Sequence, residues 1–170
     1  AGCIHQDRSE WVMRNQVVIR KGDNGDLNAI GTLWEEFMDF HRERDPHFAR
    51  SDDGHERFKE FIAGHMTEET SCVWVAQRGG SVVGYCLAML AKLPPVFEKR
   101  DYGAVFDLMV TARFRRRGIG EMLYRAAEAW FIQQGVHRIE IRVAVSNETS
   151  TSFWRKMGTR PYVTAVFKNI

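Results

Sequence analysis

Residues 113–120 constrain the fold of this chain more than any other stretch, because four arginines there precede two glycines. They lie between an apolar run at 105–110 and a helical pattern that begins near Ile119. The first N–H groups of a helix have no intrahelical partner, and the helix dipole makes that end positive. Gly118 and Gly120 would let phosphate oxygens approach the main chain closely. This strand–turn–helix arrangement predicts a site for the pyrophosphate of a nucleotide-like cofactor.

The arginine run alone is also compatible with a solvated helix start or with a patch that binds nucleic acid. The chain carries 24 basic and 22 acidic residues, a net charge of +2, which is too balanced for an obligate nucleic-acid partner. The turn contains neither the dinucleotide pattern G-x-G-x-x-G nor the Gly-Lys-Ser/Thr of a P-loop. We therefore expect a phosphate site of another kind and no nucleic-acid partner.

The composition is that of one globular domain, with 44% apolar and 27% charged residues. The three cysteines are widely spaced and form no CxxC or Cys/His cluster, so we expect reduced thiols, no metal and a cytoplasmic location. No apolar run approaches the roughly 18 residues that span a bilayer, so no membrane partner is expected. Residues 1–15 are polar and lack periodicity, and we expect a disordered extension or tag remnant there. A single domain is expected over 16–170.

The hydrophobic pattern predicts strands and helices in one α/β domain. Pro94 and Pro95 interrupt it, so residues 91–102 are expected to form an exposed loop that could cover a site. The expected strands cover 16–20, 71–77, 81–90, 103–111, 137–145 and 162–170, and the expected helices cover 27–45, 51–66, 118–134 and 148–157.

A second informative stretch, 146–158, contains a predicted short helix. Asn147 could cap that helix or donate its amide to a cofactor carbonyl. Ser150, Phe153 and Trp154 recur at spacings of three and four and therefore share one helix face. Such a face suits packing against a thin ligand arm, although capping and core packing explain the same residues.

Together the two stretches resemble the GCN5-related N-acetyltransferase (GNAT) family. Residues 115–120 fit the family's pyrophosphate signature, Arg/Gln-x-x-Gly-x-Gly/Ala, at every fixed position. The later pattern, Asn-x-x-Ala-x-x-Phe/Leu-Tyr-x-x-x-Gly-Phe, matches at Asn147, Phe153 and Gly158, with Ser150 in place of alanine. The resemblance extends from about residue 17 to the end of the sequence.

The resemblance implies a mixed, mostly antiparallel central sheet flanked by helices, in which two strands splay apart to form an acetyl-CoA cleft. Acetyl-CoA would lie between the strand that ends at Val110 and the strand around Ile141. No metal is implied, and homodimers are common in the family. The implied cofactor-binding residues are Leu108, Met109, Val110, Arg115, Arg116, Arg117, Gly118, Ile119, Gly120, Asn147, Ser150, Phe153 and Trp154.

The implied reaction is direct attack of a primary amine, on a small molecule or a protein, at the thioester of acetyl-CoA. Asp107 is the candidate base, because it is the one charge in the apolar run, although a structural aspartate would look the same. Strand alternation predicts that it faces away from Phe106 and Leu108, unless a bulge re-aims it.

In the family, a tyrosine often protonates the departing CoA thiolate, and the resemblance places it at position 154. This chain has Trp154 there, and an indole N–H cannot act as an acid. Tyr162 is therefore the candidate acid. Tyr124 could also serve, or the thiolate could leave unaided. A CoA-binding module with weak or lost catalysis is the alternative function.

The acceptor side is less readable. Acidic residues in the first helix and just after it favour a cationic acceptor, if they are not simply a solvated face: Glu35, Glu36, Asp39, Glu43 and Asp45. Aromatic residues of the same region form either a substrate wall or core packing, and the core is the preferred interpretation: Trp34, Phe37, Phe40 and Phe48. His41 and His47 could touch substrate, but a surface position is preferred for each.

Overall fold

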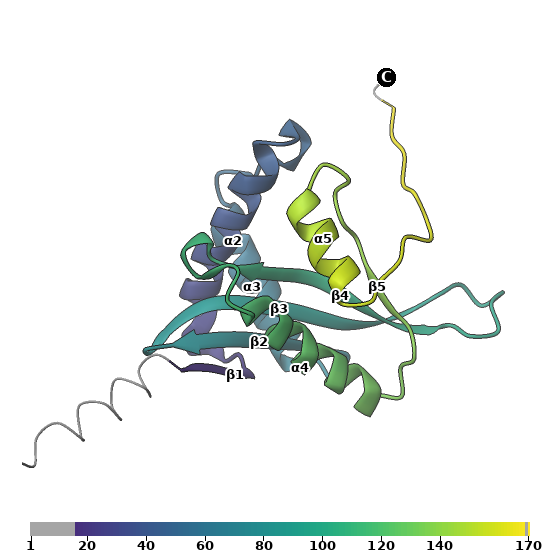
Figure 1. Cartoon of the computed structure of the whole chain (residues 1–170), viewed down its shortest axis with the longest axis horizontal. Helices are drawn as coiled ribbons and strands as arrows, with labels where there is room; N and C mark the ends of the chain where they lie inside the picture. The colour runs from purple at the N-terminus through teal and green to yellow at the C-terminus, as the bar shows by residue number, and fades with distance from the viewer. Residues whose placement is uncertain (1–15, 169) are drawn as a thin grey trace, which may run out of the picture.

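The computed structural model describes residues 16–168 and 170, so the predicted extension at 1–15 lies outside the described residues. Five strands form one sheet in the order β1-β2-β3-β4-β5 (Figure 1). The first three pairings are antiparallel and the β4–β5 pairing is parallel. The mixed, mostly antiparallel sheet is therefore confirmed.

The bounds of most elements agree with the sequence pattern to within a few residues. The strands are β1 (Val17–Lys21), β2 (Ser71–Arg78), β3 (Ser81–Lys92), β4 (Asp101–Val110) and β5 (Ile139–Ile141). The helices are α2 (Leu27–Arg42), α3 (Gly54–Thr67), α4 (Ile119–Gln133) and α5 (Glu148–Lys156), with short 3-10 turns η1 (Asn24–Asp26), η2 (Pro46–Phe48) and η3 (Ala112–Phe114).

Helices cover both faces of the sheet, and alternate residues along the strands pack against each layer. In β2, Val73 and Val75 belong to the buried cluster under α2 and α3, which is centred on Ile30, Ile62 and Tyr85. Cys72 and Ala76 belong to the cluster under α4, which also holds Leu123, Phe131 and the Trp154 side chain of α5. Figure 1 shows α4 on the face of the sheet opposite α3.

A β-bulge interrupts β4 at Phe106. Leu87 of β3 pairs with Asp107 and Ala88 pairs with Val105, which leaves Phe106 without a partner in β3. Both bulge residues then face α2 and α3, because the Phe106 ring contacts Phe61 of α3 and Asp107 accepts a hydrogen bond from Tyr85. Simple alternation would place Asp107 on the face opposite Phe106, and the structure shows the stated exception, because the extra residue of the bulge re-aims Asp107.

The pairing of β4 with β5 is short. Only Gly103–Val105 pair with Ile139–Ile141, and beyond them the two strands separate. The parallel ladder therefore ends one residue before the bulge at Phe106. The predicted strand at 137–145 is reduced to three residues, and the predicted splayed strand pair is confirmed.

The predicted closing strand at 162–170 is wrong for the residues that the structure describes there, none of which is in a strand. Val163, Val166 and Phe167 are exposed. A β-rich sequence forms a strand only where a neighbouring edge can pair with it, and three-residue β5 offers a very short one.

The loop between β3 and β4 is shorter than predicted, because both strands continue to the Lys92–Asp101 pair. Beyond it, the N–H of Leu93 donates to the C=O of Arg100. The loop lies at the end of the hairpin opposite Val110, and in Figure 1 it projects away from α2 and α5. This position gives no support to the interpretation that the loop covers a site at the turn before α4. Across residues 16–168, no helix is long and apolar enough to cross a membrane.

We expect Gly103→Ala to destabilise the fold, because its Cβ would lie 2.5 Å from the buried ring of Phe131. Overpacking of this kind costs about 1–3 kcal/mol of the free energy of unfolding, measurable by urea titration. Gly64→Ala is the control, because nothing in the structure lies within 4 Å of its Cβ position and alanine favours the interior of α3. Equal stability of the two variants would contradict this close packing of β4 against α4.

Candidate functional site

The turn before α4 has the backbone shape of an anion-binding nest. Arg116 (φ 62°) and Gly118 (φ 80°) both adopt the left-handed conformation, and α4 begins at Ile119. The N–H groups of Arg116, Arg117 and Gly118 donate to no acceptor in the described part of the chain. Those of Ile119 and Gly120 open the helix and have no intrahelical partner. Free N–H groups at the positive end of a helix dipole favour phosphate.

Arg115 has a different role from its neighbours in the turn. Its own N–H donates to the C=O of Ala112, and its Nε donates to the C=O of Val110 at 2.9 Å. One guanidinium nitrogen lies 3.4 Å from Glu36 of α2. The side chain thus joins β4, the turn and α2, and only residues 116–120 keep N–H groups free for phosphate.

Glu36 ties α2 to the segment that leads into the turn. Its carboxylate accepts the hydroxyl of Thr111 and the N–H of Ala112, each at 2.7 Å, in addition to Arg115. Sequence reasoning treated Glu36 only as part of an acidic helix, because its three partners lie more than seventy residues away.

A small cleft of about 50 Å³ lies where β4 and β5 separate. Four of the predicted cofactor residues line it: Leu108, Asn147, Ser150 and Trp154. The remaining lining residues are Phe37, His41, Val105, Phe106, Ile141, Arg142, Val143 and Ala144. The cleft therefore combines α2, the β4 bulge, the segment after β5, and α5.

The first turn of α4 adjoins this cleft. A Cβ placed on Gly120 would lie 3.5 Å from Leu108 and 3.5 Å from Phe153. The structure thus brings the arginine–glycine turn against both β4 and the second motif. Phe153 packs at the edge of the α4 cluster, so its core-packing interpretation also holds.

Asn147 caps α5, because its Oδ1 accepts the N–H of Ser150 at 3.0 Å. The residue is buried, and in the described structure its Nδ2 group donates to no protein acceptor. Capping uses only the oxygen, so the amide nitrogen is left to donate to a ligand. The two interpretations of Asn147 are therefore compatible.

Met109 and Val110 take part in the fold through their side chains. Met109 packs under α2 and α3, and Val110 packs under α4. The C=O of Val110 already accepts a hydrogen bond from Arg115. Any contact of these two residues with a cofactor would use the remaining backbone groups.

Asp107 lies beside the cleft and does not line it. Its side chain is 8% exposed, and the hydroxyl of Tyr85 donates to Oδ2 at 3.0 Å. Burial raises the pKa of Asp107 to about 6, and the hydrogen bond from Tyr85 opposes that shift. The carboxyl group therefore titrates close to neutral pH, the range that suits a general base.

The tyrosines named as candidate acids lie outside the lining of the cleft. The Tyr162 ring is 61% exposed and lies 4.3 Å from the guanidinium of Arg138. The hydroxyl of Tyr124 donates to Glu128, and burial together with that carboxylate raises its pKa to about 12. Trp154, which does line the cleft, is buried edge-on between Tyr124 and Phe153.

Helix α2 contributes Phe37 and His41, which sequence reasoning assigned to core and surface. They are four positions apart, so they share a helix face, and their rings meet edge to face at 4.5 Å. Burial, with a smaller effect from Arg44, lowers the pKa of His41. The surface interpretation is wrong for His41, and exposed His47 agrees with it. Trp34 stacks on Phe58 and belongs to the core, as preferred.

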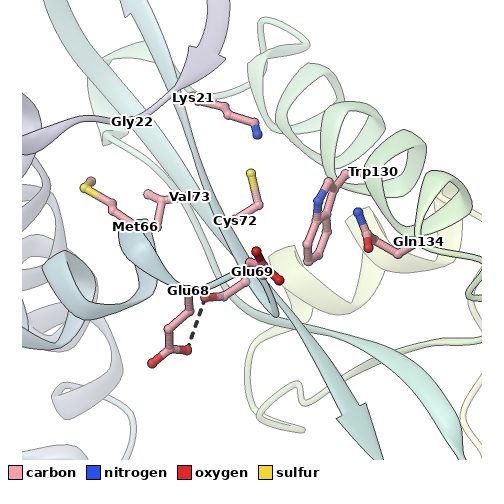
Figure 2. Close-up of a pocket in the computed structure, with 10 residues that line it drawn as sticks. Lys21, Gly22, Met66, Glu68, Glu69, Cys72, Val73, Trp130 and Gln134 are labelled. Carbon is pink, nitrogen blue, oxygen red and sulfur yellow. Dashed lines mark hydrogen bonds between the residues drawn. The ribbon is translucent and has the colours of Figure 1, made fainter.

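A larger cavity of about 390 Å³ lies elsewhere, at the last turn of α4 and the end of α3. Figure 2 shows Lys21, Cys72 and Trp130 around it, together with Glu68 and Glu69. Two carboxylates and the negative end of a helix disfavour a phosphate ligand there. The small cleft beside the nest is therefore the candidate active site. Over the described residues, no group of three or more His, Cys, Asp or Glu side chains could hold a metal ion.

Comparison with known proteins supports the same conclusion. The model of the acetyltransferase (GNAT) family matches residues 32–159. This chain belongs to that family.

Related proteins agree with this membership. An N-alpha-acetyltransferase of Sulfurisphaera tokodaii is 29% identical over 106 residues, which are 58% of this chain and 62% of that protein. The chain spans less than two thirds of the length of the curated relatives that it matches.

Solved structures share the fold at lower identity. A mutant of protein BH1408 from Bacillus halodurans superposes with a TM-score of 0.80 at 22% identity, covering 90% of this chain and 99% of that one. The aminoglycoside N-acetyltransferase AAC(6')-Iy in complex with CoA has a TM-score of 0.67 at 17% identity, covering 91% and 95%.

We expect Gly118→Glu to weaken acetyl-CoA binding at least a hundredfold, about 2.7 kcal/mol, because its carboxylate would enter the nest. Gly135→Glu is a matched control at the other end of α4. Both glycines have positive φ (80° and 75°), and neither has an atom within 4 Å of its Cβ position. Both variants should therefore lose similar stability, about 1–2 kcal/mol.

Calorimetric titration with acetyl-CoA measures the difference between these two variants. Equal affinities would place the pyrophosphate away from the nest.

Proposed function

We propose that the chain is an acetyl-CoA-dependent N-acetyltransferase that transfers the acetyl group to a primary amine by direct attack. The observation that carries the proposal is the row of free N–H groups at 116–120, which opens beside the cleft between β4 and β5. The pyrophosphate of acetyl-CoA needs such donors, and the pantetheine arm of the same cofactor needs a narrow channel that leads away from them.

The residues present fit that cofactor. The nest and the α4 dipole would hold the pyrophosphate, and Gly120 places this end of α4 against Leu108 and Phe153. The ladder with β5 ends at Val105, so the backbone groups of β4 beyond it have no partner in β5. Apart from the C=O of Val110, which accepts from Arg115, they would pair with the amides of the pantetheine arm. Asn147 would donate its Nδ2 group from the far side.

The chemistry requires one new bond, one broken bond and the removal of a proton. The amine nitrogen attacks the thioester carbonyl carbon, a C–N bond forms, and the C–S bond breaks to release the CoA thiolate. We propose that Asp107 accepts the amine proton through water, because the buried carboxylate cannot touch the amine directly. The cleft aligns the two reactants, which contributes most of the remaining acceleration.

The departing thiolate does not require a phenol. A thiol has a pKa near 8.5, so the thiolate is a tolerable leaving group at neutral pH. Tyr162 has no part in the proposal, because it lies against Arg138 outside the cleft lining. Homodimerisation and a cytoplasmic location stay predictions.

We expect acetyl-CoA to raise the melting temperature and, with a suitable amine, to release one thiol for each amine acetylated. Thermal shift and a thiol-reactive dye measure the two effects, and mass spectrometry identifies the product. Stabilisation without thiol release across a broad amine panel would indicate a CoA-binding module instead. No stabilisation at millimolar acetyl-CoA would contradict both functions.

We expect Asp107→Asn to lower the rate of acetyl transfer and to remove a pH-dependent loss of stability. The pKa of Asp107 is raised from 3.8 to about 6, so its favourable contribution is complete below pH 4 and is lost as the pH rises through 6. A shift of two pKa units corresponds to about 3 kcal/mol of the free energy of unfolding. The wild-type protein should lose this amount between pH 4 and pH 7, and Asp107→Asn should not, because it lacks the titrating group. Thiol release should fall at least a hundredfold, roughly the contribution of a general base.

Urea unfolding at pH 4 and pH 7 measures the stability difference. Asp101→Asn is the control on the same strand, because Asp101 is exposed and pairs only with exposed Lys92. Undiminished thiol release by Asp107→Asn would assign the base to another group.

A further inference from the structure

We infer that the acceptor is a primary amine carried by an apolar, aromatic group without a second cation, as in an arylalkylamine. The inference rests on the proposed function and names the substrate class of the same cleft. Four features of the described residues carry it: the lining of the cleft, the pairing of nearby carboxylates, the exposed aromatic side chains at its edge, and the charge of Arg142.

The lining of the cleft is mostly apolar and contains no carboxylate. Its polar members are His41, Arg142, Asn147 and Ser150, and every other lining side chain is a hydrocarbon or an indole. A polycation such as a polyamine or an aminoglycoside must give up water around each charge that it buries, which is unfavourable unless that charge is paired. Leu108, Asn147, Ser150 and Trp154 are the part of this lining that the proposed function assigns to the pantetheine arm. The side chains that α2 and the bulge contribute, Phe37, His41 and Phe106, offer such charges no carboxylate partner.

The acidic residues of α2 are already paired within the protein. Glu35 contacts Arg50 at 3.1 Å and His55 at 3.2 Å, and Asp39 contacts Arg42 at 3.3 Å. Glu36 accepts hydrogen bonds from Thr111, Ala112 and Arg115. These three carboxylates already have partners in the protein, so they do not favour a cationic acceptor as the sequence pattern suggested.

The two remaining acidic side chains of that region do not replace them. Asp45 accepts the N–H of His47 at the start of η2. Glu43 is two positions beyond His41 and therefore leaves the helix on the side away from it. Neither lines the cleft.

Aromatic side chains at the edge of the cleft are exposed. Phe106 lines the cleft and is still 56% exposed, because the bulge turns it out of the sheet. Its ring lies 5.5 Å from that of Phe61, which is 38% exposed. On the α2 side, the His41 ring lies 5.4 Å from that of Phe48, which is 37% exposed. Two exposed aromatic pairs thus flank the cleft, and exposed apolar side chains gathered beside a cleft are typical of a ligand-binding surface.

These features favour a particular kind of group attached to the amine of the acceptor. An aromatic ring would cover Phe106 and Phe61 in the offset or edge-on contacts that such rings prefer. The guanidinium of Arg142, at the β5 side of the cleft, would repel a second ammonium group and tolerate an uncharged or anionic substituent. The amine itself would enter between His41 and Leu108.

The test compares kcat/KM for 2-phenylethylamine, ethylamine and spermidine, with acetyl-CoA affinity measured for each variant. We expect 2-phenylethylamine to exceed spermidine at least tenfold. Phe106→Ala should lower kcat/KM for 2-phenylethylamine roughly tenfold and for ethylamine less than twofold, since only the ring is lost as a contact. Phe106→Glu, which supplies a carboxylate, should move the preference toward spermidine.

Phe97→Ala is the matched control, because Phe97 is 51% exposed and lies in the loop at the far end of the β3–β4 hairpin. Phe97→Ala should leave kcat/KM unchanged for both 2-phenylethylamine and ethylamine. A wild-type preference for spermidine, or an equal loss for both monoamines in Phe106→Ala, would overturn this inference and leave the proposed function intact. Acetyl-CoA binding without transfer to any amine would overturn the proposed function itself.

Discussion

The end of backbone pairing between β4 and β5 is the constraint on which the site depends. Their ladder stops at Val105 and Ile141, and the bulge at Phe106 begins at the next residue of β4. Two neighbouring strands normally satisfy each other's N–H and C=O groups, so separated strands need another partner. That requirement is the physical reason for our proposal that the gap binds an extended, amide-containing ligand such as pantetheine.

The bulge does more than separate the strands. It turns Phe106 outward beside the cleft and Asp107 inward under α2 and α3, on the same side of the sheet. An extra residue is the only way for two consecutive positions of a strand to share a face. One local irregularity therefore accounts for both an exposed aromatic surface and a buried carboxyl group with a raised pKa.

The second organising contact is Glu36, which holds α2 against the segment that enters the phosphate-binding turn. Hydrogen bonds to a carboxylate are stronger than neutral ones, and this group accepts from a hydroxyl, a backbone N–H and a guanidinium. Because α2 also carries Phe37 and His41 into the cleft, the same carboxylate positions the cofactor turn and the acceptor side relative to each other.

Residue order alone was sufficient for the features that depend on neighbours in the chain. The turn at 113–120, the helix that follows it and the Asn147 cap all follow from local geometry, because glycine conformation, free N–H groups and side-chain capping involve residues a few positions apart. Other features depended on contacts with distant residues: the face of Asp107, the partial burial of His41, the ion pairs of the α2 carboxylates and the absent strand at 162–168. Those contacts are Leu87 and Ala88 opposite the bulge, Arg50 and His55 beside Glu35, and the short edge of β5. No sequence pattern near each residue encodes such partners. Packing of distant residues therefore decided the side of the cleft that we propose for the acceptor, whereas local backbone chemistry decided the side that we propose for the cofactor.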